Sequence, residues 1–201
     1  MHGISLALTP SVRRIVLLLI LSTSLACGCA ATQPSASNSY ASIAPWVRRC
    51  GGVVTGPENQ RVTHALAAIS AVLGPGTHLR ASVLNSSKPA AYAWPDGSLF
   101  VTRGLMDQLD DAELTAALAH EAGHLLADQW VNPPAGLRGD GAPPECESHA
   151  DFIGCRILRA ANIPPSNMST LLHKIRAATP AHDPARPALD RRIRLLESRP
   201  D

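Results

Sequence analysis

The chain has 201 residues, 3% aromatic residues and a formal charge of +2 at pH 7. This length is enough for one domain with a hydrophobic core, and the abundant alanine predicts an aliphatic, helix-rich core. Residues 1–28 contain two arginines and no acid, which leaves 16 of the 18 basic residues and all 16 acidic residues in the rest of the chain. Such a balance excludes the basic footprint of a nucleic-acid-binding protein and argues against membrane binding through charge alone.

The N-terminus is typical of an export signal. Arg13 and Arg14 precede an apolar run over 15–26, which is too short to span a bilayer. The small residues at its end, with Cys27 and Cys29, resemble a bacterial lipoprotein signal whose cysteine becomes the lipidated N-terminus. Cys29 is the favoured lipidation site and Cys27 the alternative, while an ordinary cleaved signal is the competing interpretation.

The chain is therefore divided into a lipoprotein-type signal peptide over 1–28, a flexible tether over 29–45 and one domain over 46–201. A lipid anchor would hold an exported protein to a membrane of the bacterial cell envelope, facing the periplasm. The outer membrane is favoured because no aspartate follows either candidate cysteine.

Three further cysteines are present, and an exported location permits disulfides. Cys146 and Cys155 lie on one predicted helix about 13 Å apart, which is too far for a disulfide. Either Cys50 pairs with one of them, or all three stay reduced. Metal binding by these cysteines is disfavoured because they lack Cys-x-x-Cys spacing.

Apolar spacing and turn residues predict mainly helices and a small sheet. Helices are expected over 57–73, 104–109, from Asp110 onward, 145–161, 166–178 and 187–196, strands over 79–84, 90–94 and 98–102, and a loop over 129–144. Pro95 marks the middle strand as an edge strand, onto which an extended peptide can add. We therefore expect an α+β fold, mainly helical, with a small antiparallel or mixed sheet.

The segment 120–124 reads His-Glu-x-x-His inside a helix that a capping box of Asp110 and Glu113 would start. On a helix, His120 and His124 share one face and can both bind a metal ion. Glu121, about 100° around the helix, can take a proton from a water on that metal. The alternative is a buried helix that carries two histidines by chance.

A third ligand is needed, and Glu147 is favoured. Asp151 shares its helical face and is predicted to orient a histidine. Glu145, His149 and His182 are alternative third ligands. Without the His-Glu-x-x-His helix, Glu147 and Asp151 would read as a solvated acidic face.

Three ordered stretches resemble peptidase family M48: Phe-Val-Thr-Arg-Gly-Leu at 100–105, Leu-Ala-His-Glu-Ala-Gly-His at 118–124, and Glu-Ser-His-Ala-Asp-Phe-Ile-Gly at 147–154. The Asn-Ile-Pro-Pro stretch at 162–165 is also similar. The resemblance spans about 58 to 198. It implies a zincin-like (gluzincin) fold in which the small sheet borders the active-site helix. It also implies one zinc ion on His120, His124 and Glu147, with Glu121 as general base. The edge strand bordering the substrate would comprise Ala91, Tyr92, Ala93 and Trp94.

Near the C-terminus the chain departs from the family. Members often carry a His-Pro pair before an Arg-Ile pair, but here Arg186-Pro187 precedes Arg192-Ile193 and His182 lies four residues earlier. Either His182 or Arg186 is a candidate for stabilising an oxyanion, and ordinary surface roles are the alternative.

Two functions follow. The first is a zinc-dependent endopeptidase that hydrolyses unfolded or misassembled envelope proteins, with a polypeptide as its partner and a water activated by Glu121. The alternative is a zinc-containing binding or quality-control module with little or no cleavage, in which His149 or His182 closes the metal site. The sequence carries no prediction of oligomeric state.

Overall fold

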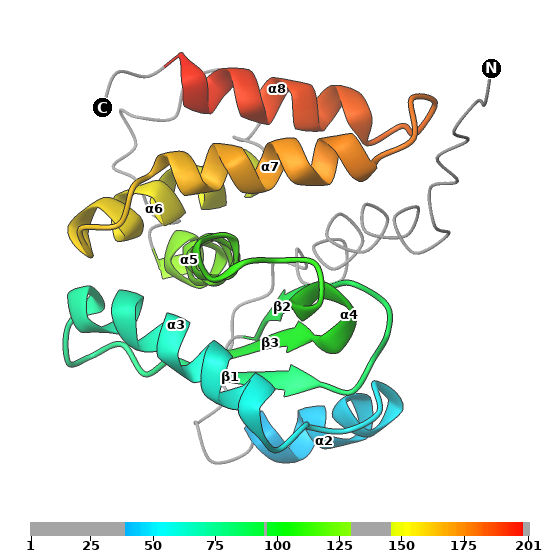
Figure 1. Cartoon of the computed structure of the whole chain (residues 1–201). Helices are drawn as coiled ribbons and strands as arrows, with labels where there is room; N and C mark the ends of the chain where they lie inside the picture. The colour runs from blue at the N-terminus through cyan, green and yellow to red at the C-terminus, as the bar shows by residue number, and fades with distance from the viewer. Residues whose placement is uncertain (1–38, 95, 130–145, 199–201) are drawn as a thin grey trace.

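The computed structural model describes residues 39–94, 96–129 and 146–198, in which seven helices accompany one three-stranded sheet. Helix α5 (Asp111–Gln129) lies in the middle of the molecule (Figure 1). The sheet and α3 (Pro57–Leu73) lie on one side of it, and α6 (Cys146–Ala160), α7 (Ser166–Ala178) and α8 (Arg186–Glu197) on the other. The predicted α+β fold, mainly helical with a small sheet, is confirmed.

The remaining elements are α2 (Ser39–Arg49), β1 (Arg80–Leu84), β2 (Ala91–Ala93), β3 (Ser98–Thr102) and α4 (Arg103–Met106). The bounds predicted for α3, β3 and α7 are those observed. Helix α4 is shorter than the predicted 104–109, and β1 and β2 are trimmed at their ends. Helix α2 was not predicted.

The sheet is mixed, with strand order β1-β3-β2. Strands β1 and β3 run parallel, while β2 and β3 run antiparallel. All five residues of β3 are buried, because helices cover both faces of the sheet. Strand β2 lies at an edge of the sheet, as the position of Pro95 predicted; Pro95 itself is outside the described residues.

Helix α2 shortens the predicted tether. Residues 39–45, assigned to the tether from their small polar composition, are the first turns of this helix. Ile43 is fully buried and Val47 nearly so, and both pack with Leu84 and Phe100 of the sheet. Apolar burial against the sheet therefore holds this segment as a helix in spite of its composition.

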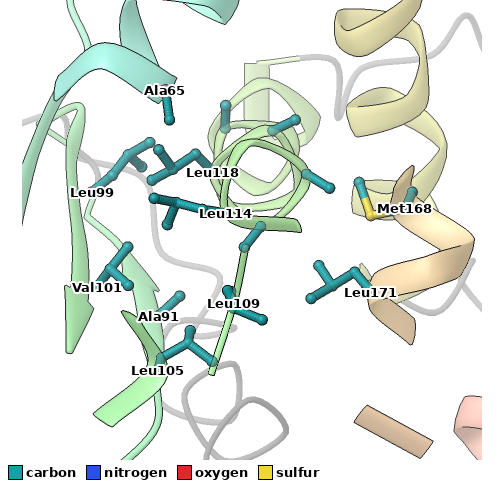
Figure 2. Close-up of a cluster of buried hydrophobic side chains, with 14 of the residues drawn as sticks. Ala65, Ala91, Leu99, Val101, Leu105, Leu109, Leu114, Leu118, Met168 and Leu171 are labelled. Carbon is teal, nitrogen blue, oxygen red and sulfur yellow. The ribbon is translucent and has the colours of Figure 1, made fainter. Parts of the chain in front are cut away.

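The main core surrounds α5, which is buried on most sides, as its apolar pattern predicted. Figure 2 shows Leu114 and Leu118 of α5 facing Leu99 and Val101 of β3, with Met168 of α7 on the opposite side. The helix is otherwise rich in buried alanines: Ala116, Ala117, Ala119 and Ala122. Because alanine adds no bulk beyond Cβ, neighbouring elements can approach the α5 backbone closely.

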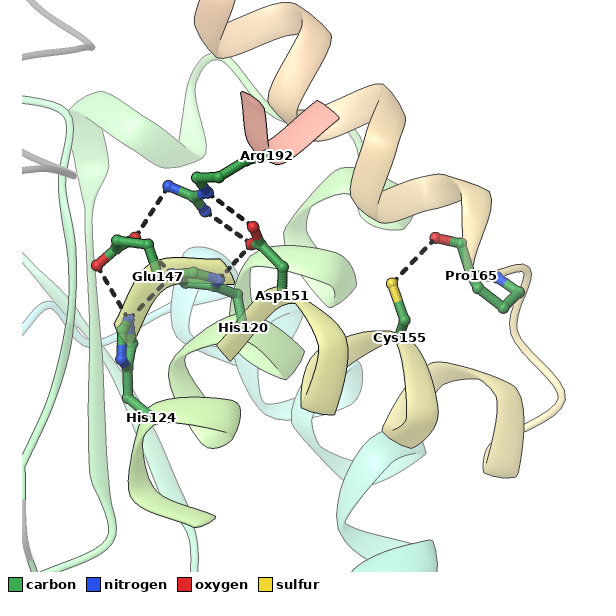
Figure 3. Close-up of polar contacts among 7 residues, drawn as sticks. All are labelled: His120, His124, Glu147, Asp151, Cys155, Pro165 and Arg192. Atoms are coloured by element: carbon green, nitrogen blue, oxygen red, sulfur yellow. Dashed lines mark hydrogen bonds and ion pairs between the residues drawn. The ribbon is translucent and has the colours of Figure 1, made fainter. Parts of the chain in front are cut away.

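In the described part of the chain, no helix combines the length and apolarity needed to cross a bilayer. The predicted signal peptide, Cys27, Cys29 and most of the loop over 129–144 lie outside the described residues. Cys50 is a free thiol, so for this residue the reduced alternative holds. The Cys155 thiol lies 3.8 Å from the carbonyl oxygen of Pro165 (Figure 3).

Candidate metal centre

Helix α5 starts with the predicted capping box. The Glu113 backbone N–H donates to Asp110 Oδ1 over 2.8 Å, and the Asp110 N–H donates to Glu113 Oε2 over 2.9 Å. This reciprocal pair satisfies two donors that the first turn would otherwise leave open. The His-Glu-x-x-His segment thus belongs to a helix with a fixed start, surrounded by core.

Two glycines bring α5 and α6 into backbone contact. A Cβ on Gly123 would lie 2.5 Å from the carbonyl oxygen of Ala150, and a Cβ on Gly154 would lie 3.2 Å from the backbone of Ala119. Any side chain at Gly123 would force the helices apart. Gly154 allows this approach from α6, and Gly123 allows it from within the His-Glu-x-x-His segment of α5.

The close approach places the first carboxylate of α6 against both histidines (Figure 3). The Nε2 atoms of His120 and His124 lie 3.1 Å apart. Glu147 Oε2 lies 3.4 Å from His120 Nε2, and Glu147 Oε1 lies 3.5 Å from His124 Nε2. One ligand atom from each of the three residues falls within 4.8 Å of the other two, so this group can hold a metal ion.

The donor set fits a cation. Among the described residues, Glu147 Oε1 is buried without a hydrogen-bond partner. A buried, unsatisfied carboxylate oxygen beside two converging imidazole nitrogens is unfavourable unless a positive charge lies between them. Two histidines and one carboxylate are a donor set that zinc accepts at catalytic sites. The predicted ligands His120, His124 and Glu147 are therefore brought together as expected.

Asp151 orients His120, as predicted. It is 1% exposed, and it accepts a hydrogen bond from His120 Nδ1 over 2.9 Å. That bond directs the other ring nitrogen, Nε2, toward Glu147 and His124. The sequence pattern therefore singled out the two carboxylates of α6 that lie beside the histidines.

Arg192 of α8 is the site residue whose role the sequence analysis missed. Its Nε and Nη2 each donate to a different oxygen of Asp151 over 2.7 Å, and Nη1 donates to Glu147 Oε2 over 2.9 Å. One guanidinium thus holds both carboxylates of α6. A signal was present: Arg192 lies on the same helical stripe as the buried Leu189 and Ile193.

The charges of the site perturb one another strongly. Burial alone would lower the pKa of His120, but hydrogen bonds to Asp151 and Glu147 outweigh it and raise this pKa to about 10. Burial alone would raise the pKa of Glu147, but the hydrogen bond from His120 and the charges of His120 and Arg192 lower it to about 2. The pKa of Asp151 is lowered for the same reasons. Without metal, His120 is therefore a cation between two carboxylates.

The pKa of Glu121 is shifted in the opposite direction from those of Glu147 and Asp151. Burial raises its pKa to about 7, with the charge of His120 opposing and that of Glu147 adding to the rise. A carboxyl group that titrates near neutrality can both accept and donate a proton there, as a general base and acid must. The pKa of His124 is lowered to about 4, first by burial and then by the charge of His120, so this imidazole is a neutral ligand.

The candidate oxyanion residues do not join this group. His182 is exposed between α7 and α8. The Arg186 guanidinium donates to the carbonyl oxygens of Arg176 and Thr179 at the end of α7. These contacts favour an ordinary role for Arg186, whereas the oxyanion role of His182 stays a prediction. Among described residues His149 does not belong to the donor group either, and Glu145 lies outside them.

A pocket beside the metal centre is bounded by polar groups on one side and by α7 and α8 on the other. Glu121 and Arg192 contribute to its polar wall. Its apolar wall contains Met168, Leu171, Leu172, Ile175 and Leu189. These apolar residues are buried members of the main core, so the space is a small void beside the metal centre.

Strand β2 packs against α5, and among the described residues no strand pairs with its outer edge. The Thr102 N–H donates to the Ala90 carbonyl, and the Trp94 N–H donates to the Ser98 carbonyl. Backbone groups alternate in direction along a strand, so Ala91 and Ala93 turn theirs away from β3. The backbone of Ala93, which is partly exposed, is therefore the part of this edge that an incoming chain could reach, whereas Ala91 is fully buried; the strand ends one residue before Trp94.

Comparison with known families agrees with this site. Residues 55–132 match the model of peptidase family M48. This stretch contains α3, the sheet and α5, and with them His120, Glu121 and His124. Glu147, Asp151 and Arg192 lie beyond it, so their assignment rests on the geometry. A comparison with curated protein sequences finds no match.

Proposed function

Since residues 55–132 match the model of peptidase family M48, which supports a metalloprotease, we propose that the chain is a zinc-dependent endopeptidase holding one zinc ion through His120, His124 and Glu147. The observation that carries the proposal is the convergence of these three donors beside Glu121, whose pKa is raised to about 7. A structural zinc site has no use for such a carboxyl group and is normally closed by four protein ligands.

The chemistry divides between the ion and the chain. When bound, zinc would act as a Lewis acid on the peptide carbonyl and would acidify a water molecule. Glu121 takes the proton of the attacking water and then delivers it to the leaving amine, for which a pKa near neutrality is suited. Asp151 keeps Nε2 of His120 directed toward the ion, and Arg192 keeps Glu147 in place.

The substrate would bind as an added strand. The partly exposed edge at Ala93 would offer its backbone donor and acceptor to an extended chain, and the packing of β2 against α5 would bring that chain toward Glu121. Only an unfolded segment can present a free backbone of this length, so unfolded or misassembled proteins are the proposed substrates.

The deciding experiment replaces Glu121 by glutamine, which keeps the side-chain shape but cannot accept the proton. We expect turnover of unfolded casein to fall by about a thousandfold, while one zinc ion per chain is retained. Glu197→Gln, at an exposed residue paired with His173, is the matched control and should keep full activity. A fully active Glu121→Gln protein would rule out the proposed mechanism.

The binding-module alternative makes a different forecast in the same experiment. It requires that the parent protein binds casein without cleaving it and that Glu121→Gln changes neither property. It also needs a fourth protein ligand, and the donor group among the described residues has three members. The three-member group therefore supports the peptidase.

We also propose that the protein is exported and lipid-anchored in the bacterial cell envelope, on the basis of the signal-like residues 13–29. Labelling with a radioactive fatty acid tests this directly. Cys29→Ala should abolish the label and Cys27→Ala should leave it. Labelling that survives the Cys29 substitution but not the Cys27 substitution would show that Cys27 is the lipidated residue. An unlabelled parent protein would rule out the lipid anchor.

A further inference from the structure

The strand proposed to receive the substrate has little of its own to hold it. Strand β2 has three residues, Ala91–Ala93, and within the described residues it pairs only with β3. Short edge strands with a single neighbour open readily. Helix α5 packs on one face of β2, where Ala91 lies in the main core. The other face also needs a contact, because a strand that opens loses the spacing of donors and acceptors that a substrate strand would need.

That contact comes from α2. The ring of Trp46 lies 5.0 Å from the ring of Tyr92 at 86° and 4.9 Å from the ring of Trp94 at 33°. It also lies 5.5 Å from Phe100 of the adjacent strand. Tyr92 and Trp94 flank Ala93, whose backbone faces the open edge. The Trp46 ring therefore packs against the residues on both sides of Ala93, whose backbone a substrate strand would use.

Helix α2 is itself fastened to the opposite edge of the sheet. The Asn85 N–H donates to the Gly52 carbonyl over 2.9 Å, and the Val54 N–H donates to the Val83 carbonyl over 2.8 Å. Gly51 has φ of 86°, and a Cβ there would lie 2.3 Å from the Asn85 carbonyl oxygen. The turn after α2 is thus anchored to β1, which gives Trp46 a fixed base from which to hold β2.

We propose that Trp46 is a positioning residue that holds the edge strand β2 in the conformation that a substrate strand needs. The proposal rests on the proposed function, because it assumes that the open edge of β2 receives the polypeptide. Trp46 lies outside the stretch 55–132 that matches the family model. The device therefore belongs to this chain's own N-terminal helix, and it touches neither the metal ligands nor Glu121.

Binding is best measured without turnover, on the full zinc-loaded chain carrying Glu121→Gln, with fluorescein-labelled β-casein as an unfolded probe. Adding Trp46→Ala should weaken casein binding by about tenfold, as expected when a binding edge loses its alignment. Trp46→Phe keeps a ring against Tyr92 and should restore most of the affinity. Ile69→Ala, in the core face of α3, is the control for general destabilisation and should leave casein affinity unchanged.

Two further readouts separate positioning from folding. Zinc content should be the same in every variant, and the amides of residues 91–94 should exchange hydrogen faster in Trp46→Ala than in Ile69→Ala. In the active protein, Trp46→Ala should raise KM and leave kcat unchanged.

Unchanged casein affinity in a folded, zinc-loaded Trp46→Ala protein would overturn the proposal, as would equal losses of affinity in Trp46→Ala and Ile69→Ala. Failure of the proposed function looks different. It would appear as a parent protein that cleaves nothing, before any substitution at Trp46 is tested.

Discussion

The metal centre and the edge strand β2 lie on neighbouring elements but are held by different forces. At the metal centre, a buried arginine, two carboxylates and a histidine fix one another through hydrogen bonds of 2.7–2.9 Å. At the edge, Trp46 holds Tyr92 and Trp94 by ring packing alone. The first region is polar and defined to a fraction of an ångström, whereas the second is apolar and more tolerant.

The two regions should therefore respond differently to substitution. A substitution at the metal centre leaves a buried charge without its partner, so it should reduce stability and metal binding together. A substitution at the edge leaves the metal untouched and should change only how a polypeptide binds. The predictions below test whether the two regions separate in this way.

The largest effect is expected at Arg192. Replacing it by methionine keeps much of the side-chain volume but removes the partner of Asp151, which is 1% exposed, and of Glu147. Breaking a buried ion pair by removing one partner costs about 3–5 kcal/mol. Urea unfolding of the metal-free protein measures the change. Arg191→Met, at the exposed neighbouring position, is the control, and equal losses in the two variants would show that Arg192 does not hold the carboxylates.

Removal of Glu147 should act on the metal. Glu147→Ala should weaken zinc binding by more than about 100-fold, since even residues that only support a ligand contribute 10–100-fold. His149→Ala, two residues later on the same helix, should leave it unchanged. Competition with a chelating dye gives both values. Undiminished zinc affinity in Glu147→Ala would transfer the third ligand to another residue.

Gly123 tests the helix contact that brings the ligands together. In Gly123→Ala, the added methyl group would meet the Ala150 carbonyl oxygen at 2.5 Å, so α6 must move away from α5. We expect a loss of about 1–3 kcal/mol in stability and weaker zinc binding. Gly76→Ala is the matched control, because nothing lies within 4 Å of its Cβ position. Stable, fully zinc-binding Gly123→Ala would mean that the contact can relax without moving Glu147.

Most of the fold could be predicted from local patterns. Helix α3 and strand β3 have clean periodicity and clear stop residues, and the capping box at Asp110 fixed the start of α5. Helix α2 could not be predicted, because Ile43 and Trp46 stand among small polar residues. These two side chains stabilise the helix only by packing against the sheet, and the sheet forms from later parts of the chain.

The site was predictable where its residues lie at helical spacing. His120, His124, Glu147 and Asp151 follow from positions four apart on two helices. Arg192 does not, because it stands among other arginines, and only its tertiary contacts distinguish it. The same limit explains Arg186: matching a position in a motif could not reveal that its guanidinium binds the end of α7.

Metal binding should also depend on pH, by the smallest step of these predictions when counted per pH unit, because protons compete with zinc at His120. Hydrogen bonds to Asp151 and Glu147 overcome the effect of burial and raise its pKa from 6.5 to about 10, so His120 is charged at pH 8.5 and must lose its proton to bind zinc. The Kd for zinc should fall about tenfold for each pH unit between pH 7 and 10, or about 1.4 kcal/mol per unit, and level off above.

Calorimetry at pH 8.5 in buffers of different ionisation enthalpy should detect about one proton released per zinc ion. His124 adds none, since its pKa is lowered to about 4, and Glu121, with a pKa of about 7, is already ionised at this pH. A raised histidine pKa also stabilises the metal-free fold below pH 6.5, and this stabilisation is lost as the pH rises toward 10. Zinc affinity that stays constant from pH 7 to 10 would show that His120 is neutral without metal. Arg192 would then be the cation that compensates the charges of Asp151 and Glu147.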